Sequence, residues 1–159
     1  MGLFLEKKRM IDKSLDILID TNILIYSTLK NDTRYQTAQS ILLENTEYSG
    51  YKYTTTQNLG EMYPNLTGPK MSEPDDPVLA REKIESIAAL PDVTVLPLTN
   101  DIVSLALELS QKYGIRRQKY FDMQIAAFML RYSIPLLITE NTKDFEGIEN
   151  IIPVNPFLK

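Results

Sequence analysis

Short apolar runs alternate with longer amphipathic segments along most of this chain. The apolar runs at 15–19, 93–98, 136–139 and 151–155 are typical of strands, and the aromatic and β-branched residues at 51–56 also favour a strand. Between them, recurring apolar or small residues such as Ala38, Ile41 and Leu42, together with cap and stop residues, predict helices. The expected helices span 22–30, 34–45, 57–66, 77–90, 100–114 and 118–133. Strands that alternate with helices favour a mostly parallel sheet covered on both faces, which is a three-layer α/β sandwich.

Proline and glycine mark several element boundaries. Pro64 is expected to disturb the helix that contains it, and three prolines make 67–78 a loop over one face. Pro77 suits the first position of a helix, and Gly114 suits the end of another. The 159 residues suffice for one domain, so we expect an N-terminal extension at 1–14 and a single domain at 15–159.

The apolar stretches are too short for export or membrane insertion. The chain begins with a four-residue apolar run, which is shorter than the apolar core of a secretory signal. Elsewhere the longest apolar stretches are interrupted by Asp20, Arg131 or Pro135, well before the roughly 20 residues that cross a bilayer. We therefore expect a cytoplasmic protein without a membrane span.

The composition narrows the chemistry that is available. The sequence contains no cysteine and no histidine, so thiol nucleophiles, disulfides, thiolate zinc sites and imidazole chemistry are excluded. Carboxylates, hydroxyls and amides remain, and oxygen ligands of this kind suit hard cations such as Mg²⁺ or Mn²⁺. The net charge of −4 argues against a basic surface that coats nucleic acid, but it is compatible with a nucleic-acid enzyme whose active site is acidic.

Two acidic residues stand in apolar surroundings. Asp20 follows the first strand and precedes a helix, at the carboxyl end where open α/β sheets bind ligands. A helix N-cap is the structural alternative for this residue. Asp122 shares a helical face with Ile125 and Met129 and is expected to point toward the core. An ionised carboxylate there is costly, so Asp122 is expected to bind a metal, pair with a buried arginine or take up a proton.

Two further acids follow strands. Glu61 lies on the helix after the second strand, and Asp144 follows the fourth strand. Taken alone, they are a solvated helix residue and a loop residue. Taken with Asp20 and Asp122, they form a set of four acids at or above the carboxyl ends of strands. Carboxylates that lie within a few ångströms of one another repel strongly unless cations lie between them, so this set predicts a divalent-metal site.

Three segments resemble motifs of the PIN-domain nuclease family. ILIDTNILIY at 17–26 is similar to the family's opening strand with Asp-Thr-Asn, and TTTQNLGEMY at 54–63 is similar to its second motif. The segment 120–156 is similar to the final motifs, with an acid followed by Ile-Ala-Ala, an apolar strand ending in Thr, and Asn-Thr-Lys-Asp-Phe. The resemblance covers roughly residues 15–156 and implies a PIN-like α/β/α fold.

The resemblance also implies roles for individual residues. The acidic cluster that holds Mg²⁺ or Mn²⁺ would consist of Asp20, Glu61, Asp122 and Asp144. Asn22 and Thr139 would be polar supports beside it. Many relatives have aspartate at the position of Asn141, whose amide can still supply an oxygen, so the fourth ligand comes from Asn141 or Asp144.

The small single-domain members of the family are mostly VapC-type toxins that cut RNA. By resemblance, this chain is expected to be an Mg²⁺- or Mn²⁺-dependent endoribonuclease that leaves a 5′-phosphate and a 3′-hydroxyl. Such toxins usually form homodimers and are inhibited by an antitoxin protein that inserts a segment into the acidic groove. We therefore expect an RNA substrate, an antitoxin and a second copy of the chain as partners.

Other interpretations stay open at this point. The chain can be a phosphatase with Asp20 as the nucleophile, although Asn22 stands where such enzymes commonly carry a second aspartate. It can also be a non-catalytic PIN-like module that binds RNA or protein, although the presence of all four acids favours an enzyme. The basic residues Arg116, Arg117 and Lys119 are candidates for contacts with RNA phosphates, and their alternative is a solvated helix end.

Overall fold

The computed structural model describes residues 10–45 and 47–158. Residues 1–9 of the expected N-terminal extension lie outside the described residues. Within the extension, the Lys13 carbonyl accepts a hydrogen bond from the backbone N–H of Ser49. The domain boundary at residue 15 stays a prediction.

One five-stranded sheet runs through the described part of the chain. Its strands are β1 (Ile17–Ile19), β2 (Lys52–Thr55), β3 (Val93–Leu96), β4 (Leu136–Ile138) and β5 (Ile152–Val154). They lie in the order β3-β2-β1-β4-β5, and every neighbouring pair is parallel. Ile17 of the central strand pairs with Lys52 on one side and Leu136 on the other. The predicted parallel α/β sandwich is therefore confirmed.

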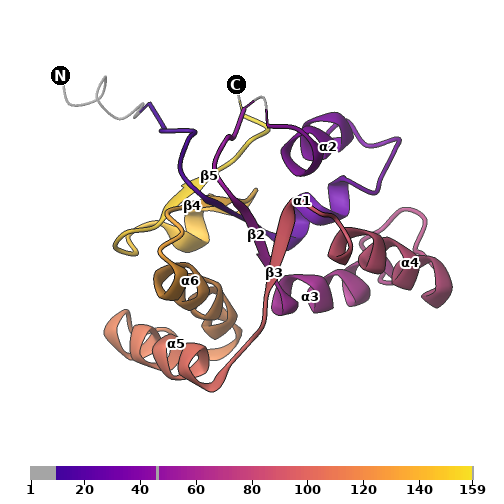
Figure 1. Cartoon of the computed structure of the whole chain (residues 1–159). Helices are drawn as coiled ribbons and strands as arrows, with labels where there is room; N and C mark the ends of the chain where they lie inside the picture. Colours follow the sequence, from indigo (N-terminus) through magenta and orange to yellow (C-terminus); the bar gives the residue numbers. More distant parts are fainter. Residues whose placement is uncertain (1–9, 46, 159) are drawn as a thin grey trace.

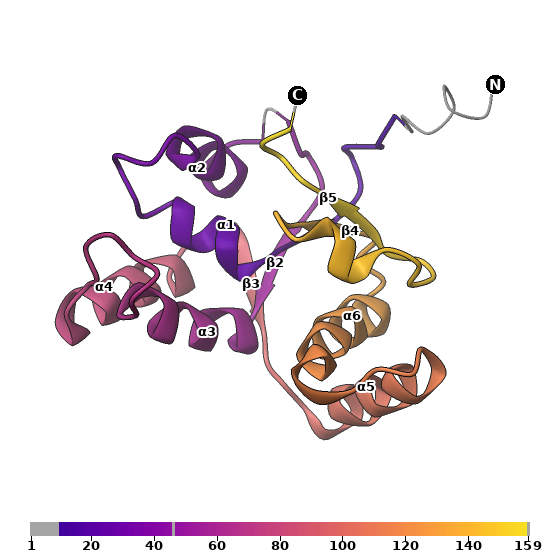
Figure 2. The same cartoon turned by 180° about the vertical axis from the view of Figure 1, so that it is seen from behind.

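Helices cover both faces of the sheet (Figures 1 and 2). The helices on one face are α1 (Thr21–Tyr26), α2 (Tyr35–Leu43), α3 (Thr56–Leu66) and α4 (Pro77–Ala88). The opposite face is covered by α5 (Asn100–Lys112) and α6 (Tyr120–Tyr132). Two short 3₁₀ turns, η2 (Arg117–Lys119) and η3 (Thr142–Phe145), precede α6 and follow β4.

The side chains of β1 alternate between the two layers. Ile17 and Ile19 pack in the cluster under α1 to α4, whereas Leu18 packs in the cluster under α5 and α6. All three side chains are fully buried, which explains why the strand is a continuous apolar run.

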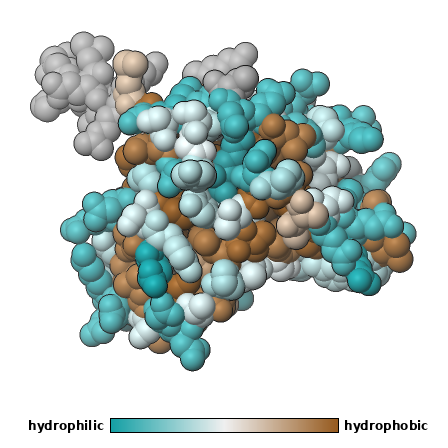
Figure 3. Space-filling model, in the orientation of Figure 1, coloured by the Kyte–Doolittle hydropathy of each residue, from teal (hydrophilic) through white to brown (hydrophobic). Residues whose placement is uncertain are grey.

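Figure 3 shows apolar side chains reaching the surface across the middle of one face of the molecule, with hydrophilic residues around them.

Several element boundaries differ from the predictions. The first helix ends at Tyr26 and not at residue 30, because the hydroxyls of Ser27 and Thr28 donate to carbonyls of its last turn. Pro64 stays inside α3, where it lies so close to the C-terminus that its missing N–H disturbs only the last turn. No helix in the described ranges is both long enough and apolar enough to cross a membrane.

Candidate active site

A pocket of about 200 Å³ opens at the carboxyl ends of the central strands. Its position follows from the topology, because Asp20 directly follows β1, α3 directly follows β2 and Thr139 directly follows β4. Three of the four predicted acids line it. The lining residues are Asp20, Thr21, Asn22, Ile25, Glu61, Asn65, Asp122 and Asn141.

The Asp20 carboxylate accepts hydrogen bonds from α1, from α3 and from the segment after β4. Its Oδ1 accepts from the backbone N–H of Thr21 at 2.8 Å and from Asn58 Nδ2 at 3.1 Å, and its Oδ2 accepts from Thr139 Oγ1 at 2.7 Å. The residue is 9% exposed, and burial raises the pKa of its carboxyl, while the bond from Thr139 opposes that change. Asp20 is also the N-cap of α1, so one carboxylate both caps the helix and lines the pocket.

Asn58 is a functional candidate that sequence reasoning missed. It is 0% exposed, and its Nδ2 donates to Asp20 Oδ1 and to Thr21 Oγ1, in both cases at 3.1 Å. Its Oδ1 accepts from Thr55 Oγ1 at 2.7 Å, and its backbone N–H donates to the same hydroxyl. The available sequence signal was the Thr-x-x-Asn spacing at the start of α3, which is typical of a helix N-terminus.

Glu61 is fixed by a chain of polar side chains. Its Oε2 accepts from Thr21 Oγ1 at 3.1 Å, and its Oε1 accepts from Gln57 Nε2 at 2.7 Å. Gln57 Oε1 in turn accepts from Nε2 of the buried Gln124 at 2.6 Å. This chain connects α3 to α6, and neither glutamine was predicted as part of the site.

Asp122 enters the pocket from the first turn of α6. Burial raises the pKa of its carboxyl to about 6, the charges of Asp144, Asp20 and Glu61 contribute in the same direction, and Lys119 opposes them. Its carboxylate makes neither a hydrogen bond nor an ion pair within the described residues, so the alternative of a buried arginine partner finds no support there.

Asn141 and Asp144 occupy different places. Asn141 lines the pocket, and its backbone N–H donates to Thr139 Oγ1 at 3.1 Å. Asp144 is exposed on η3 and does not line the pocket, yet its charge raises the pKa of both Asp20 and Asp122. Asn141 is therefore part of the pocket lining, whereas Asp144 lies outside the lining but near enough for its charge to raise the pKa of Asp122.

The predicted polar supports lie beside the pocket. Asn22 Nδ2 donates to Thr139 Oγ1 at 3.4 Å, and its Oδ1 accepts from the backbone N–H of Glu140 at 3.2 Å. The Asn22 amide is thus engaged by the segment after β4, as a polar support beside the pocket.

A second network, which the sequence did not indicate, holds the same segment. Arg34 lies over the ring of Tyr26 at 3.7 Å, and its Nη1 donates to Glu140 Oε2 at 3.0 Å. Arg34 also pairs with Asp32. Burial and the bond to Glu140 raise the pKa of Tyr26 to about 12, so its hydroxyl stays protonated and donates to Glu140. Glu140, which follows Thr139, is therefore held through its backbone N–H by Asn22 and through its carboxylate by Tyr26 and Arg34.

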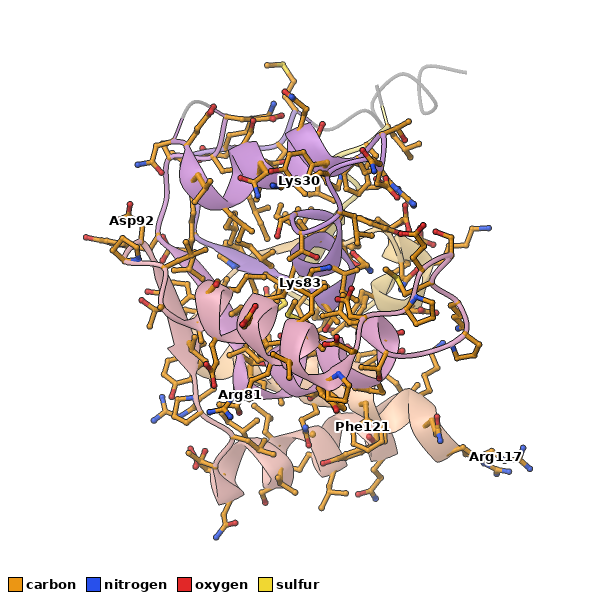
Figure 4. The ribbon with its side chains drawn as sticks, turned by 90° about the vertical axis from the view of Figure 1, so that its right-hand side faces the viewer. Lys30, Arg81, Lys83, Asp92, Arg117 and Phe121 are labelled. Atoms are coloured by element: carbon orange, nitrogen blue, oxygen red, sulfur yellow. The ribbon has the colours of Figure 1, made fainter. Side chains whose placement is uncertain are left out.

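The basic residues Arg116, Arg117 and Lys119 are exposed and do not line the pocket. Figure 4 shows Arg117 projecting away from the body of the molecule. Its φ of 57° lies in the left-handed region, which is uncommon for a residue with a side chain. Lys119 is the one of the three whose charge lowers the pKa of Asp122.

The pocket offers the type of ligand atom that hard divalent cations prefer, which is oxygen. The ligand atoms are carboxylate and amide oxygens, and none of the four predicted acids pairs with a lysine or arginine in the described residues. As the side chains are arranged, no three acidic residues of the described chain stand close enough to chelate one ion. As arranged, the three carboxylates that line the pocket therefore do not form a direct three-ligand site for one ion.

The parallel sandwich and the pocket at the carboxyl ends of its central strands define an α/β protein with an acidic pocket where open α/β sheets bind their ligands. The PIN domain family model matches residues 17–150, and the chain belongs to this family. No curated protein sequence matches the chain.

Solved structures show the same fold. VapC20 from Mycobacterium tuberculosis, described as a toxin that cleaves the sarcin–ricin loop, is 20% identical with a TM-score of 0.63, over 86% of this chain and 99% of that one. VapBC2 from Rickettsia felis, bound to a promoter DNA fragment, is 19% identical with a TM-score of 0.61, over 89% and 98%. VapBC-1 from nontypeable Haemophilus influenzae is 21% identical with a TM-score of 0.60, also over 89% and 98%.

Proposed function

We propose that this chain is a divalent-metal-dependent endoribonuclease of the cytoplasm and the toxin of a toxin–antitoxin pair. The observation that carries the proposal is the pocket in which Asp20, Glu61 and Asp122 converge without a cationic partner in the described residues. Membership of the PIN domain family and the similarity to VapC structures support it. The substrate is RNA, and hydrolysis leaves a 5′-phosphate and a 3′-hydroxyl.

In this proposal Asp20, Glu61 and Asp122 hold Mg²⁺ or Mn²⁺, with Asn141 or Asp144 completing the set. A bound ion of this kind supplies a water of lowered pKa and neutralises charge on a phosphate oxygen. Asp20 is the most rigid ligand, because its three hydrogen bonds fix both oxygens. A bound cation should change the charge state of Asp122 most, because its carboxylate has a raised pKa and no other partner in the described residues.

The proposed partners are an antitoxin protein and a second copy of the chain. Two of the similar structures are complexes named VapBC, which supports an antitoxin partner. The antitoxin would be expected to cover the acidic pocket. Co-expression with the protein encoded beside this chain, followed by size-exclusion chromatography, tests both partners, and a solitary monomer under these conditions would contradict them.

A cleavage assay tests the enzyme directly. Purified protein is incubated with end-labelled RNA in Mg²⁺, Mn²⁺, Ca²⁺ or EDTA, and the products are analysed for their end groups. Cleavage is expected with Mg²⁺ or Mn²⁺, weaker with Ca²⁺, and absent with EDTA and in Asp122→Asn. Cleavage by the purified protein that survives EDTA would contradict the proposed metal dependence, and cleavage that survives the substitution would contradict the proposed role of Asp122. RNA binding without cleavage in any metal would favour a non-catalytic module.

A further inference from the structure

Gly60 leaves a bare surface beside the acidic pocket. It lies inside α3, directly before Glu61, and apart from its chain neighbours and the backbone of its own helix no heavy atom stands within 4 Å of the point where a Cβ would be. Its backbone does not have a positive φ, so neither conformation nor crowding requires a glycine. Glycine is also among the least favourable residues for a helix interior. The outer surface of α3 is therefore open at this position, directly before Glu61.

Phe121 is an exposed aromatic side chain next to the same surface. It directly precedes Asp122, is 48% exposed, and meets the Tyr120 ring edge-on at 5.2 Å. Gln57 of α3 donates from Nε2 to the Phe121 carbonyl at 3.2 Å. Figure 4 shows Phe121 at the surface between the helices of the two layers.

The two residues lie on neighbouring parts of one surface. Gly60 is three residues after Gln57 on α3, and residues at this spacing are neighbours on a helix. Gln124 is three residues after Phe121 on α6 and also bonds to Gln57, so Phe121 lies on the side of α6 that faces α3. Gln57 therefore connects the two residues: its side chain bonds to the Phe121 carbonyl, and Gly60 lies about one turn further along α3, directly before Glu61.

We propose that the Phe121 ring and the bare surface at Gly60 bind one nucleobase of single-stranded RNA, adjacent to the phosphate held at the acidic pocket. The inference rests on the proposed nuclease function and deepens it. An exposed ring can stack on the face of any base, which anchors the strand without selecting its sequence. The missing side chain at position 60 leaves room for the base and its ribose. Stacking beside Asp122 would set the register of the strand over the acids.

Substitutions at Phe121 separate stacking from general apolar contact. The binding of a fluorescein-labelled single-stranded RNA 12-mer is measured by anisotropy in Ca²⁺, and KM and kcat are measured in Mn²⁺. Phe121→Trp is expected to bind as the native protein does, whereas Phe121→Leu and Phe121→Ala weaken binding by about 5- to 150-fold. KM is expected to rise with little change in kcat.

Matched variants control for folding and for exposed aromatic surface. Tyr132→Ala removes a ring that is 39% exposed at the other end of α6, roughly 16 Å along the helix, and should leave binding unchanged. Gly60→Leu fills the bare surface, so it should weaken RNA binding while the melting temperature holds or rises.

Three results would overturn the inference. Equal binding by Phe121→Leu and the native protein would show that no stacking occurs. A Phe121→Ala variant that dissociates a dimer on size exclusion, with RNA binding unchanged, would show that the surface is a protein interface. A native protein that does not bind the 12-mer at all would overturn the proposed function as well, whereas native binding that is insensitive to Phe121 and Gly60 would overturn this inference alone.

Discussion

Asp122→Asn is expected to stabilise the metal-free protein at neutral and alkaline pH. The carboxyl of Asp122 has a pKa of about 6, against an ordinary value of 3.8, because it is buried and close to other carboxylates. Below the ordinary value it is protonated in both the folded and the unfolded state, and it has no effect on stability. As the pH rises toward 6 the unfolded state releases its proton first, so the free energy of unfolding falls, and above 6 the loss is complete.

The size of the effect follows from the two pKa values. Their difference corresponds to about 3 kcal/mol, and solvent around the half-buried carboxylate reduces this to about 1–2 kcal/mol. The asparagine loses no hydrogen bond made within the described residues. For a chain of 159 residues the melting temperature should therefore rise by about 3–6 °C in the variant.

Thermal melts in EDTA at about pH 8 and about pH 4 measure this, because the gain should be present at the first pH and nearly absent at the second. Asp101→Asn is a matched control in the first turn of α5. Bonds from Thr99 and its own backbone, and then Arg131, lower the pKa of Asp101, so its replacement should reduce stability at the higher pH.

With Mn²⁺ at about 100 times the dissociation constant, the native protein should gain about 2.7 kcal/mol that Asp122→Asn does not gain. A lower melting temperature for metal-free Asp122→Asn at both pH values would refute the reasoning.

Three other substitutions test the site. Asn58→Ala removes a fully buried amide, so Asp20 and two threonine hydroxyls lose hydrogen-bond partners. The free energy of unfolding, measured by chemical denaturation, should fall by about 2–4 kcal/mol. A fall below about 1 kcal/mol would mean that water replaces the amide. Asp20→Asn keeps an acceptor for the helix cap, so the free energy of unfolding of the metal-free protein should change by no more than about 1 kcal/mol. The Mn²⁺-induced rise in melting temperature should shrink, and RNA cleavage should be lost. Retained cleavage would leave Asp20 as a helix cap alone. Reversing the charges of Arg116 and Arg117 should weaken RNA binding and reduce its salt slope by somewhat under one per lost phosphate contact, and an unchanged slope would return both residues to solvated surface.

The fold was predictable because the strands are apolar or rich in β-branched and aromatic residues, and the helices repeat apolar or small residues with helical spacing. β1 shows why this works: it is buried on both faces, so all three residues must be apolar. Asp20 and Asp122 were also predictable, since each is a carboxylate in surroundings where an unpaired charge is costly.

The polar network around the acids was not predictable from single positions. Asn58 bonds to Asp20 across 38 residues, Gln124 bonds to Gln57 across 67, and Arg34 bonds to Glu140 across 106. In sequence these residues are ordinary polar positions on helices or in loops. Their partners are determined by the tertiary fold, which brings the first turn of α3 to α6 and Arg34 to the segment after β4, and no local pattern describes these contacts.

The central position of β1 affects when the pocket can exist during synthesis. Thr139 lies 119 residues after Asp20, yet its hydroxyl completes the bonding of that carboxylate. A ribosome adds roughly 5–20 residues per second, so about 6–24 s separate the emergence of these two residues. During this interval the nascent chain already carries Asp20, Glu61 and finally Asp122, but it lacks the neighbouring strand that orders them. A newly made molecule therefore cannot assemble its acidic pocket until β4 and Thr139 have been synthesised.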